Sequence, residues 1–369
     1  MSTQVLLHTL LKEMMTRQAS DLHLGVGFCP MLRLHGELEP SSHKEALTAE
    51  ITWGIAQMIM GEKHRLKFES RHEVDLAFNL SGGNRYRANI FTQRGFVTLA
   101  IRAVPLTVPT FEELGLPPIL EGLANNRRGL ILISGTTGSG KSTTLAAMVE
   151  HINSTRKAHI LTIEDPIEFV HHNKKSIVSQ RELGLDTNNY AEALRAAMRE
   201  DPNVILVGEM RDLDTVSAAI TAAQTGHLVL STIHTTNTIQ IINRILDLYP
   251  PHQQTQVRFQ LGETLKGAIS QRLLPISQGD GRVAALEIMV VTPLIQKAIE
   301  ENNFSDVQNA IRNGRFYGMQ TFNQALLALY NAGRVTMEDA MTASGNPEEF
   351  MLGVRGIVNT SNNHGEAPE

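Results

Sequence analysis

The chain has 369 residues, of which 42% are apolar and 19% are charged, the ordinary composition of a globular protein. Lys and Arg number 33 against 38 Asp and Glu, so the basic surplus typical of nucleic-acid-binding proteins is absent. Cys29 is the one cysteine, which excludes an internal disulfide and a four-cysteine zinc site. The sequence has no signal-peptide pattern and no apolar run of the roughly 20 residues that a membrane helix needs, so we expect a cytosolic protein.

Residues 1–104 are predicted to form a small α+β domain. An amphipathic helix pattern opens it, with Leu and Met at helical spacing between Leu6 and Met15. Short strand-like runs separated by glycines follow at 21–24, 31–38, 74–78 and 85–90. Four prolines then fall within 105–118, and because proline fixes φ and lacks an N–H, this stretch is predicted to be an extended linker.

Residues 119–355 are predicted to form an α/β domain around a buried parallel sheet. Runs rich in Ile, Leu and Val alternate with helical segments, and four of these runs end in polar residues or glycine: 130–134, 160–163, 204–207 and 228–230 with its continuation. Ligands of open α/β sheets bind beyond the carboxyl ends of the strands, so a site is expected there. From about residue 255 the pattern predicts mostly helix, and 356–369 a disordered tail.

The first of these strands leads into a phosphate-binding loop. The motif GxxxxGK[ST] is filled at 135–142 and a helix begins at Thr143, which is the context that the motif requires. Glycines let backbone N–H groups surround the phosphates of ATP, Lys141 is expected at the β- and γ-phosphates, and the Ser142 hydroxyl on Mg²⁺. The nucleotide-binding residues are therefore Gly135, Thr136, Thr137, Gly138, Ser139, Gly140, Lys141, Ser142 and Thr143.

Carboxylates end two further strands. Glu209 follows a buried run, where a water-activating base or a metal-linked acid belongs, although an ion pair with Arg211 is the structural alternative. Gly208 occupies the usual place of the Walker B aspartate. Glu164 and Asp165 close another strand and could orient water and metal, while an Asp-Pro pair alone is typical of a solvated turn. The predicted metal-site residues are Ser142, Glu164 and Glu209.

Two histidines bracket the fourth strand, and an arginine cluster marks the first domain. His227 and His234 are seven residues apart, which makes a shared metal site implausible; either could approach the γ-phosphate or be structural. Arginines recur at 85, 87, 94 and 102. Such a run is normally a solvated face, but in an oligomeric ATPase it can stabilise phosphate charge in a neighbouring site.

Together these residues resemble the PilT family of type IV pilus retraction ATPases, within the secretion-type ATPase superfamily. The resemblance runs from Ala19 to Phe350 and is most specific in five segments and a C-terminal Gly-Met-Gln-Thr. These are 138–148, 162–169, 200–202, 208–212, 225–228 and, at the C-terminal end, 318–321.

The resemblance implies a RecA-like ATPase domain preceded by a PAS-like domain, arranged in a hexameric ring. ATP hydrolysis would drive pilus disassembly at the inner membrane, so the partners would be a membrane platform protein and a paralogous ATPase, with no nucleic acid and membrane contact only through partners. Glu209 would be the catalytic base and Glu164 the Asp-box acid. His227 and His234 would form the His box, and Arg87 and Arg102 would contact phosphate.

Two comparisons within the superfamily refine this placement. Pilus-extension and type II secretion relatives carry a four-cysteine zinc insert, which this chain lacks, so the retraction branch is favoured. Retraction motors carry Ala-Ile-Arg-Asn-Leu-Ile-Arg-Glu after a Thr-Pro, but here Gln296 and Glu300 replace both arginines. An accessory paralogue, or a secretion or DNA-translocation ATPase, therefore stays open as an alternative.

Overall fold

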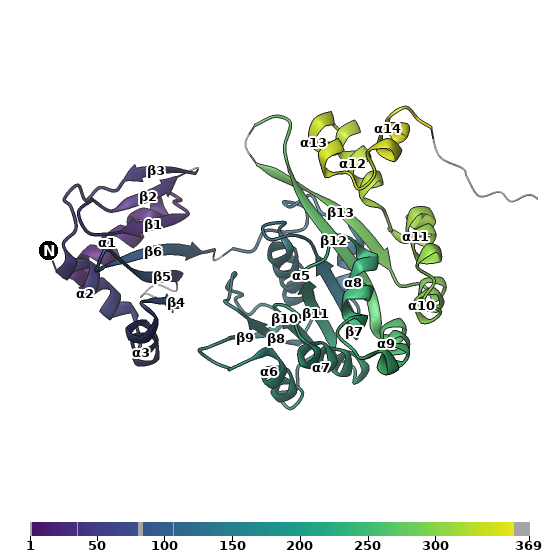
Figure 1. Ribbon diagram of the computed structural model, residues 1–369, viewed down its shortest axis with the longest axis horizontal. Coiled ribbons are helices and arrows are strands. Elements are labelled where there is room, and N and C mark those ends of the chain that lie inside the picture. Colours follow the sequence, from purple (N-terminus) through teal and green to yellow (C-terminus); the bar gives the residue numbers. More distant parts are fainter. Residues whose placement is uncertain (1, 35, 80–83, 106, 280, 358–369) are drawn as a thin grey trace, which may run out of the picture. The chain divides into compact units, whose positions relative to one another are not determined.

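The computed structural model describes residues 2–34, 36–79, 84–105, 107–279 and 281–357. The chain divides into two compact units (Figure 1): unit 1 contains Met1–Thr107 with Glu168–Val170, and unit 2 contains Val108–Ile167 with His171–Glu369. Phe111 and Leu116 are buried in the core of unit 2, so the linker is shorter than the predicted 105–118. In the described part of the chain, no helix has the length and apolar character needed to span a membrane.

In its described residues, unit 1 is a six-stranded antiparallel sheet with three helices, and the strand order is β3-β2-β1-β6-β5-β4. In strand β5, alternate residues are buried, which shows that one face of the sheet is covered. Tyr86, Ala88 and Ile90 lie on this face, while the residues between them point to the other face. The elements are α1 (Thr3–Thr16), β1 (Asp21–Leu24), β2 (Met31–Leu34), β3 (Glu37–Pro40), α2 (Ala49–Ile59), α3 (Glu62–Arg71), β4 (Glu73–Asn79), β5 (Arg85–Gln93) and β6 (Phe96–Val104).

The predicted α+β character of unit 1 agrees with these elements, with two differences. The single strand expected at 31–38 is a hairpin, because Gly36 adopts a φ of 90° and turns the chain between β2 and β3. Strand β6 was not predicted. It pairs with both β1 and β5 and so joins the two halves of the sheet.

Unit 2 is a seven-stranded sheet of order β13-β12-β7-β11-β10-β8-β9, parallel except for β13. The four predicted strands are β7, β8, β10 and β11, which lie side by side in its centre. The elements up to residue 264 are α4 (Ile119–Ala124), β7 (Gly129–Ser134), α5 (Lys141–Thr155), β8 (His159–Glu164), β9 (Ile177–Glu182), α6 (Tyr190–Ala197), β10 (Val204–Val207), α7 (Leu213–Gln224), β11 (Leu228–Ile233), α8 (Thr238–Leu246) and α9 (Pro251–Thr264).

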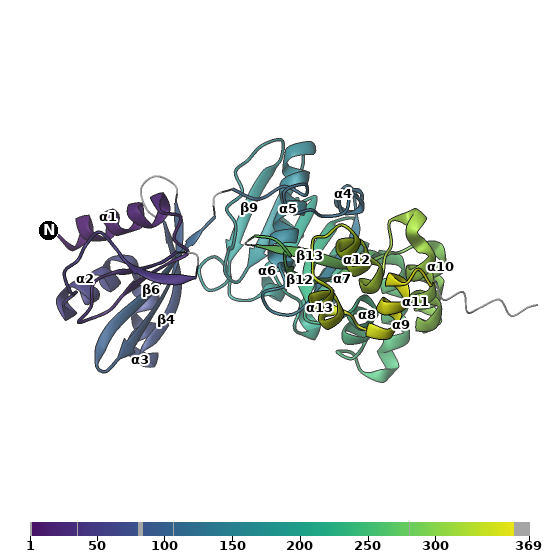
Figure 2. The ribbon, with the colours of Figure 1, turned by 90° about the horizontal axis from the view of Figure 1, so that it is seen from above.

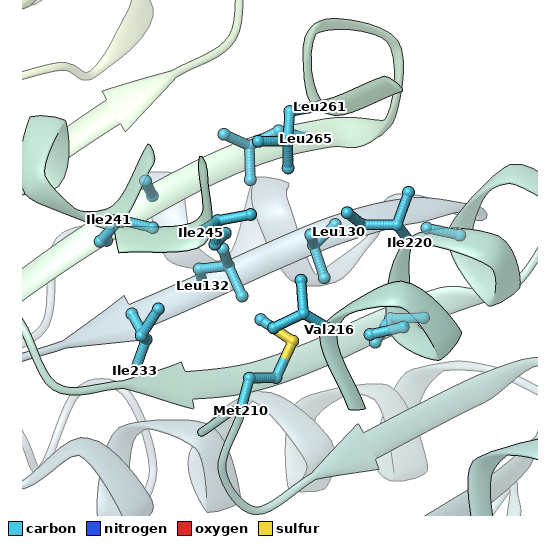
Figure 3. Close-up of a cluster of buried hydrophobic side chains, with 14 of the residues drawn as sticks. Leu130, Leu132, Met210, Val216, Ile220, Ile233, Ile241, Ile245, Leu261 and Leu265 are labelled. Atoms are coloured by element: carbon cyan, nitrogen blue, oxygen red, sulfur yellow. The ribbon is translucent and has the colours of Figure 1, made fainter. Parts of the chain in front are cut away.

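Helices cover both faces of this sheet (Figure 2). Leu130 and Leu132 of β7 pack into the core with α7, α8 and α9, whereas Ile131 and Ile133 pack with α4 and α5 on the other face. Figure 3 shows the first core, where Met210 and Val216 lie among side chains from the sheet and the helices. Burial on both faces explains the continuous apolar runs of the central strands.

The region after residue 255 is mostly helical, as predicted, but the prediction missed two long strands within it. Two long strands form an antiparallel hairpin, and β12 joins the sheet beside β7. Helices follow only after residue 292. The remaining elements are β12 (Leu265–Pro275), β13 (Arg282–Val290), α10 (Pro293–Glu300), α11 (Phe304–Asn313), the 3₁₀ helix η1 (Gly314–Tyr317), α12 (Phe322–Asn331), α13 (Met337–Ala343) and α14 (Pro347–Val354). The tail predicted at 356–369 lies, from residue 358 on, outside the described residues.

Candidate active site

The phosphate-binding motif forms the turn between β7 and α5. Gly138 and Gly140 have φ of 79° and 87°, a left-handed conformation that glycine adopts at little cost. Gly140 is the N-cap of α5, so the loop delivers the helix N-terminus, with its free N–H groups and positive dipole end, to the centre of the turn. Thr136, Thr137 and Gly138 at the crest of the loop are exposed.

Two buried groups point into this turn. The Lys141 ammonium donates to the carbonyl oxygens of Gly135 and Thr136, at 2.9 Å each, so the loop curls around it. Ser139 Oγ is buried and has no hydrogen-bond partner among the described residues. Buried polar atoms are almost always hydrogen-bonded, so Ser139 Oγ is suited to a phosphate oxygen. Ser142 is exposed in the first turn of α5, and Thr143, next to it, is half-buried.

Glu209 lies just past the carboxyl end of β10, and both of its carboxylate oxygens have partners. Arg211 Nη2 is 2.6 Å from Oε2, and His234 Nε2 is 3.0 Å from Oε1. The Glu209 side chain is 14% exposed and that of Arg211 is 73% exposed. The hydrogen bond from Arg211 to this carboxylate raises the pKa of Arg211. Thr232 of β11 fixes the turn, because its hydroxyl donates to the Gly208 carbonyl at 2.7 Å and its carbonyl accepts from the Met210 N–H at 3.0 Å.

A cavity of about 620 Å³ opens beside Glu209. Its lining mixes apolar and polar groups and carries both signs of charge, with His234, Arg211, Arg244 and Asp247 among the lining residues. It continues along α8 from Gln240 to the C-cap residue Asp247, so water and solute reach the carboxylate from this side.

Glu164 ends β8, the strand next to β10, so the structure brings it to the same edge of the sheet as Glu209. Its Oε1 accepts hydrogen bonds from Thr162 Oγ1 at 2.6 Å and from Gln180 Nε2 at 3.2 Å. Glu164 as a whole is half-buried at the end of the strand.

Tyr190, which sequence reasoning missed, is the first residue of α6 and reaches the same edge. Its hydroxyl is 2.8 Å from the position that a Cβ of residue 208 would take. Burial raises the pKa of Tyr190, and the carboxylates of Asp165, Glu209 and Glu164 raise it further, so the hydroxyl stays protonated. A neutral hydroxyl group thus lies where a side chain at position 208 would begin.

The two histidines lie at opposite edges of the sheet. His234 follows β11 at the carboxyl edge and contacts Glu209. His227 precedes β11 at the amino edge, where its Nδ1 is 2.9 Å from the Ala222 carbonyl and its own carbonyl accepts from the Gly129 N–H. The expectation that both histidines contribute to one site is therefore not met within this chain, since only His234 reaches the carboxylates.

Arg87 and Arg102 are Cα partners on β5 and β6 of unit 1, so they lie next to each other on one face of the sheet. Arg102 Nε donates to Asp21 Oδ1 at 2.8 Å. Their expected contact with phosphate stays a prediction.

The residues present fit a nucleotide triphosphate with Mg²⁺. In the described part of the chain, no group of three or more His, Cys, Asp or Glu side chains could hold a metal by itself. Mg²⁺ normally keeps several waters and takes one or two protein ligands beside phosphate oxygens. One exposed hydroxyl on Ser142, with Glu164 and Glu209 at neighbouring strand ends, matches that preference.

Comparison with known proteins shows the family of the chain. The family model for "Type II/IV secretion system protein" matches residues 107–342. The type IV pilus retraction ATPase PilT of Pseudomonas aeruginosa is 45% identical over 337 residues, which cover 90% of this chain and 96% of PilT. The type IV pilus ATPase PilU of the same bacterium is 38% identical over 346 residues, covering 94% of this chain and 90% of PilU.

Solved structures lead to the same family. The crystal structure of the pilus retraction motor PilT with bound ADP superposes with a TM-score of 0.86 at 48% identity, covering 92% of this chain and 97% of that chain. The predicted fold class, a RecA-like α/β ATPase unit after a smaller α+β unit, is thereby confirmed. The chain belongs to the type II/IV secretion system ATPases and, within them, to the PilT family of type IV pilus retraction ATPases.

Proposed function

We propose that this protein hydrolyses ATP at the carboxyl edge of its unit 2 sheet and converts the reaction into retraction of type IV pili. The observation that carries this proposal is the convergence at one edge: the loop 135–142 ends β7, while Glu164, Glu209 and His234 end or follow β8, β10 and β11. These four strands are neighbours in the sheet, so the groups can act on one bound nucleotide.

The loop would hold the phosphates. Lys141, now bonded to Gly135 and Thr136 carbonyls, would place its charge on the β- and γ-phosphates, and the N–H groups at the start of α5 would complete the cradle. Ser142 would supply the protein hydroxyl to Mg²⁺, which when bound neutralises part of the phosphate charge.

Glu209 would orient the attacking water and accept its proton, with Glu164 holding water or a metal-bound water from the neighbouring strand. His234 fixes one carboxylate oxygen of Glu209 by its contact at 3.0 Å, and Arg211 holds the other. Because Arg211 is mostly exposed, its contact is the weaker constraint and is the one that a neighbouring subunit could open.

The mechanical function follows from the family. We propose a homohexameric ring at the cytoplasmic face of the inner membrane, docked to the pilus platform protein at the pilus base. In that ring, Arg87 and Arg102 would supply phosphate contacts, because they form an adjacent basic pair on the sheet of unit 1.

One observation favours a second candidate, an accessory ATPase that works beside a primary retraction motor. Gln296 and Glu300 replace the two arginines that retraction motors carry after Thr-Pro, and PilU, a paralogue of PilT in one bacterium, is also similar over nearly the whole chain. In this case the ATPase chemistry is unchanged, and only its coupling to the fibre differs.

A turnover assay tests the enzymatic proposal. The full chain should hydrolyse ATP steadily in the presence of Mg²⁺, and Glu209→Gln should abolish turnover while ADP and ATP still bind. Glu263→Gln, an exposed position on α9, is the matched control and should retain wild-type turnover. Undiminished turnover in Glu209→Gln would remove Glu209 from the mechanism.

A deletion in a piliated cell separates the two candidates. A primary motor predicts loss of twitching with surplus surface pili, reversed by the wild-type gene and not by the Glu209→Gln gene. Unchanged retraction after deletion leaves the accessory role.

A further inference from the structure

The unpredicted strand β12 lies directly beside the phosphate loop. It runs parallel to β7, and Ser270 is the Cα partner of Ser134, the last residue before the loop. The two serine hydroxyls are buried and hydrogen-bonded to each other. The next residue, Gln271, is therefore placed where the backbone leaves the sheet at Gly135.

Gln271 contacts both ends of the loop. Its carbonyl oxygen is 2.5 Å from the position that a Cβ of Gly135 would take, and its side-chain Nε2 is 2.7 Å from that of Gly140. Its side-chain Oε1 accepts a hydrogen bond from Thr144 Oγ1 at 2.8 Å, on the first turn of α5. Gln271 and Thr144 are both buried.

These contacts clamp the loop between β12 and α5. Gly135 and Gly140 have no room for a side chain, and φ at Gly140 lies in the left-handed region, so the main chain can approach the glutamine closely. The hydrogen bond to Thr144 fixes the amide plane, which keeps Nε2 against Gly140. Gln271 thereby holds the start of the loop with its main-chain carbonyl and the helix N-terminus with its side chain.

We propose that Gln271 is a positioning residue of the nucleotide site, which acts through Thr144 and Gly140 to hold the loop 135–142 in the curvature that phosphate requires. The inference rests on the proposed function, in which this loop binds the nucleotide. Without the clamp, part of the binding free energy is spent on ordering the loop, so nucleotide affinity falls. Chemistry at Glu209, which lies beyond the end of another strand, changes less.

The experiment compares Gln271→Met, which keeps the side-chain length and loses the amide, with the wild type. We expect the Kd for ADP and the KM for ATP to rise together by about tenfold, the size of one broken buried hydrogen bond, with kcat changed less than about threefold. Thr144→Val should show the same rise, and Thr144→Ser, which keeps the hydroxyl, should restore wild-type values. The double variant Gln271→Met with Thr144→Val should be no worse than the poorer single variant.

Gln320→Met is the matched structural control. Gln320 donates its amide to the Leu286 carbonyl at 2.8 Å, away from the loop, so the same substitution removes the same kind of hydrogen bond. Its melting temperature should fall with unchanged ADP affinity. The inference is overturned if Gln271→Met and Thr144→Val bind ADP within twofold of the wild type, or if their effects multiply in the double variant. All affinities are measured at 10 °C, where less stable variants stay folded, and if Gln271→Met does not fold, the Thr144→Val and Thr144→Ser pair decides.

Lys141→Gln separates this inference from the proposed function. Loss of ADP binding in Lys141→Gln with wild-type affinity in Gln271→Met refutes the inference alone. Retained ADP binding in Lys141→Gln refutes the assignment of the loop as the nucleotide site.

Discussion

His234 Nε2 lies 3.0 Å from Glu209 Oε1, which joins the end of β11 to the end of β10 across the carboxyl edge of the sheet. The two side chains are within hydrogen-bonding distance, although the histidine and the glutamate are 25 residues apart in the sequence. A carboxylate that is held on one side by an imidazole has a fixed orientation, and orientation is what a water-activating base needs.

The first prediction concerns this contact. His234→Ala should lower kcat by about 10- to 100-fold, because Glu209 loses the group that orients it, while the Kd for ADP stays within twofold. His234→Gln keeps a hydrogen-bond donor and should recover part of the loss. Steady-state kinetics and ADP titration measure both effects. His252→Ala, an exposed position on α9, is the control and should behave as the wild type. A loss of ADP affinity in His234→Ala would make this histidine a binding group instead.

The second prediction concerns Gly208, where a side chain has no space. A Cβ there would be 2.8 Å from the Tyr190 hydroxyl and 3.3 Å from the Ile163 carbonyl oxygen. Gly208→Ala should therefore destabilise the fold by about 1–3 kcal/mol. In the Tyr190→Phe background the closest atom is gone, so the same substitution should cost much less. Gly345→Ala is the control, because nothing lies within 4 Å of its Cβ position. Urea unfolding of the four variants measures this, and equal costs in both backgrounds would contradict the steric account.

Much of the fold could be predicted because burial leaves a pattern in the sequence. The four central strands are covered on both faces and read as continuous apolar runs, and β1 was placed at its actual bounds. Strand β12 was missed because two of its buried residues, Ser270 and Gln271, are polar, and their hydrogen-bond partners come from distant segments. A periodic pattern of apolar residues cannot reveal a buried polar residue whose hydrogen-bond partner is distant in the sequence.

The candidate site likewise contains residues that the sequence pattern indicates and residues that it does not. The loop 135–142 could be predicted because local backbone geometry dictates its glycines, and Glu209 and His234 because they directly follow apolar runs. Tyr190 could not be predicted, because it begins a helix and reaches Gly208 only through the packing of α6 on the sheet. His227 is next to β11 in the sequence, as His234 is. It precedes the strand, however, so it lies at the opposite end from the candidate site.

The third prediction concerns pH and the ion-pair cluster on α5. Burial alone would raise the pKa of Glu150, but hydrogen bonds from His171, Lys174 and Asn153 outweigh it and lower the pKa from 4.5 to about 2. A depressed pKa in the folded state stabilises the fold above the unfolded value of 4.5, and this contribution is lost as the pH falls from about 4.5 towards 2.

Glu150→Gln should therefore be less stable than the wild type at pH 7 by about 1–2 kcal/mol, after allowing for solvent screening. The difference should shrink steadily below pH 4.5. Urea unfolding between pH 7 and pH 3.5 measures it. Lys174→Met removes one of the three hydrogen-bond donors to Glu150. Its loss of stability relative to the wild type should depend on pH in the same way, but should be smaller. A stability difference that is constant with pH would contradict the role of this carboxylate.

The fourth prediction concerns the segment in which this chain departs from retraction motors. Gln296 Nε2 donates to Glu300 Oε1 at 2.9 Å, and both side chains contact the position of a Cβ at Gly262 of α9, at 3.3 and 3.0 Å. The two replaced arginine positions thus form a pair packed between α9 and α10, whereas Leu294 on the same helix is 60% exposed.

Replacing Gln296 and Glu300 by alanine should lower stability by about 1 kcal/mol and leave ATP turnover within twofold, because neither residue touches the carboxyl edge of the sheet. Leu294→Glu should leave both stability and turnover unchanged, but should reduce twitching if the exposed face of α10 contacts the pilus machinery. Lys297→Glu, which changes the charge at another exposed position of α10, is the control. It shows whether a negative charge on this helix is enough to reduce twitching. Since Gln296 and Glu300 pack against Gly262 of α9, restoring both arginines should disturb the α9–α10 packing before it alters any docking surface. A double arginine variant with unchanged stability and altered retraction would show that these positions act outward after all.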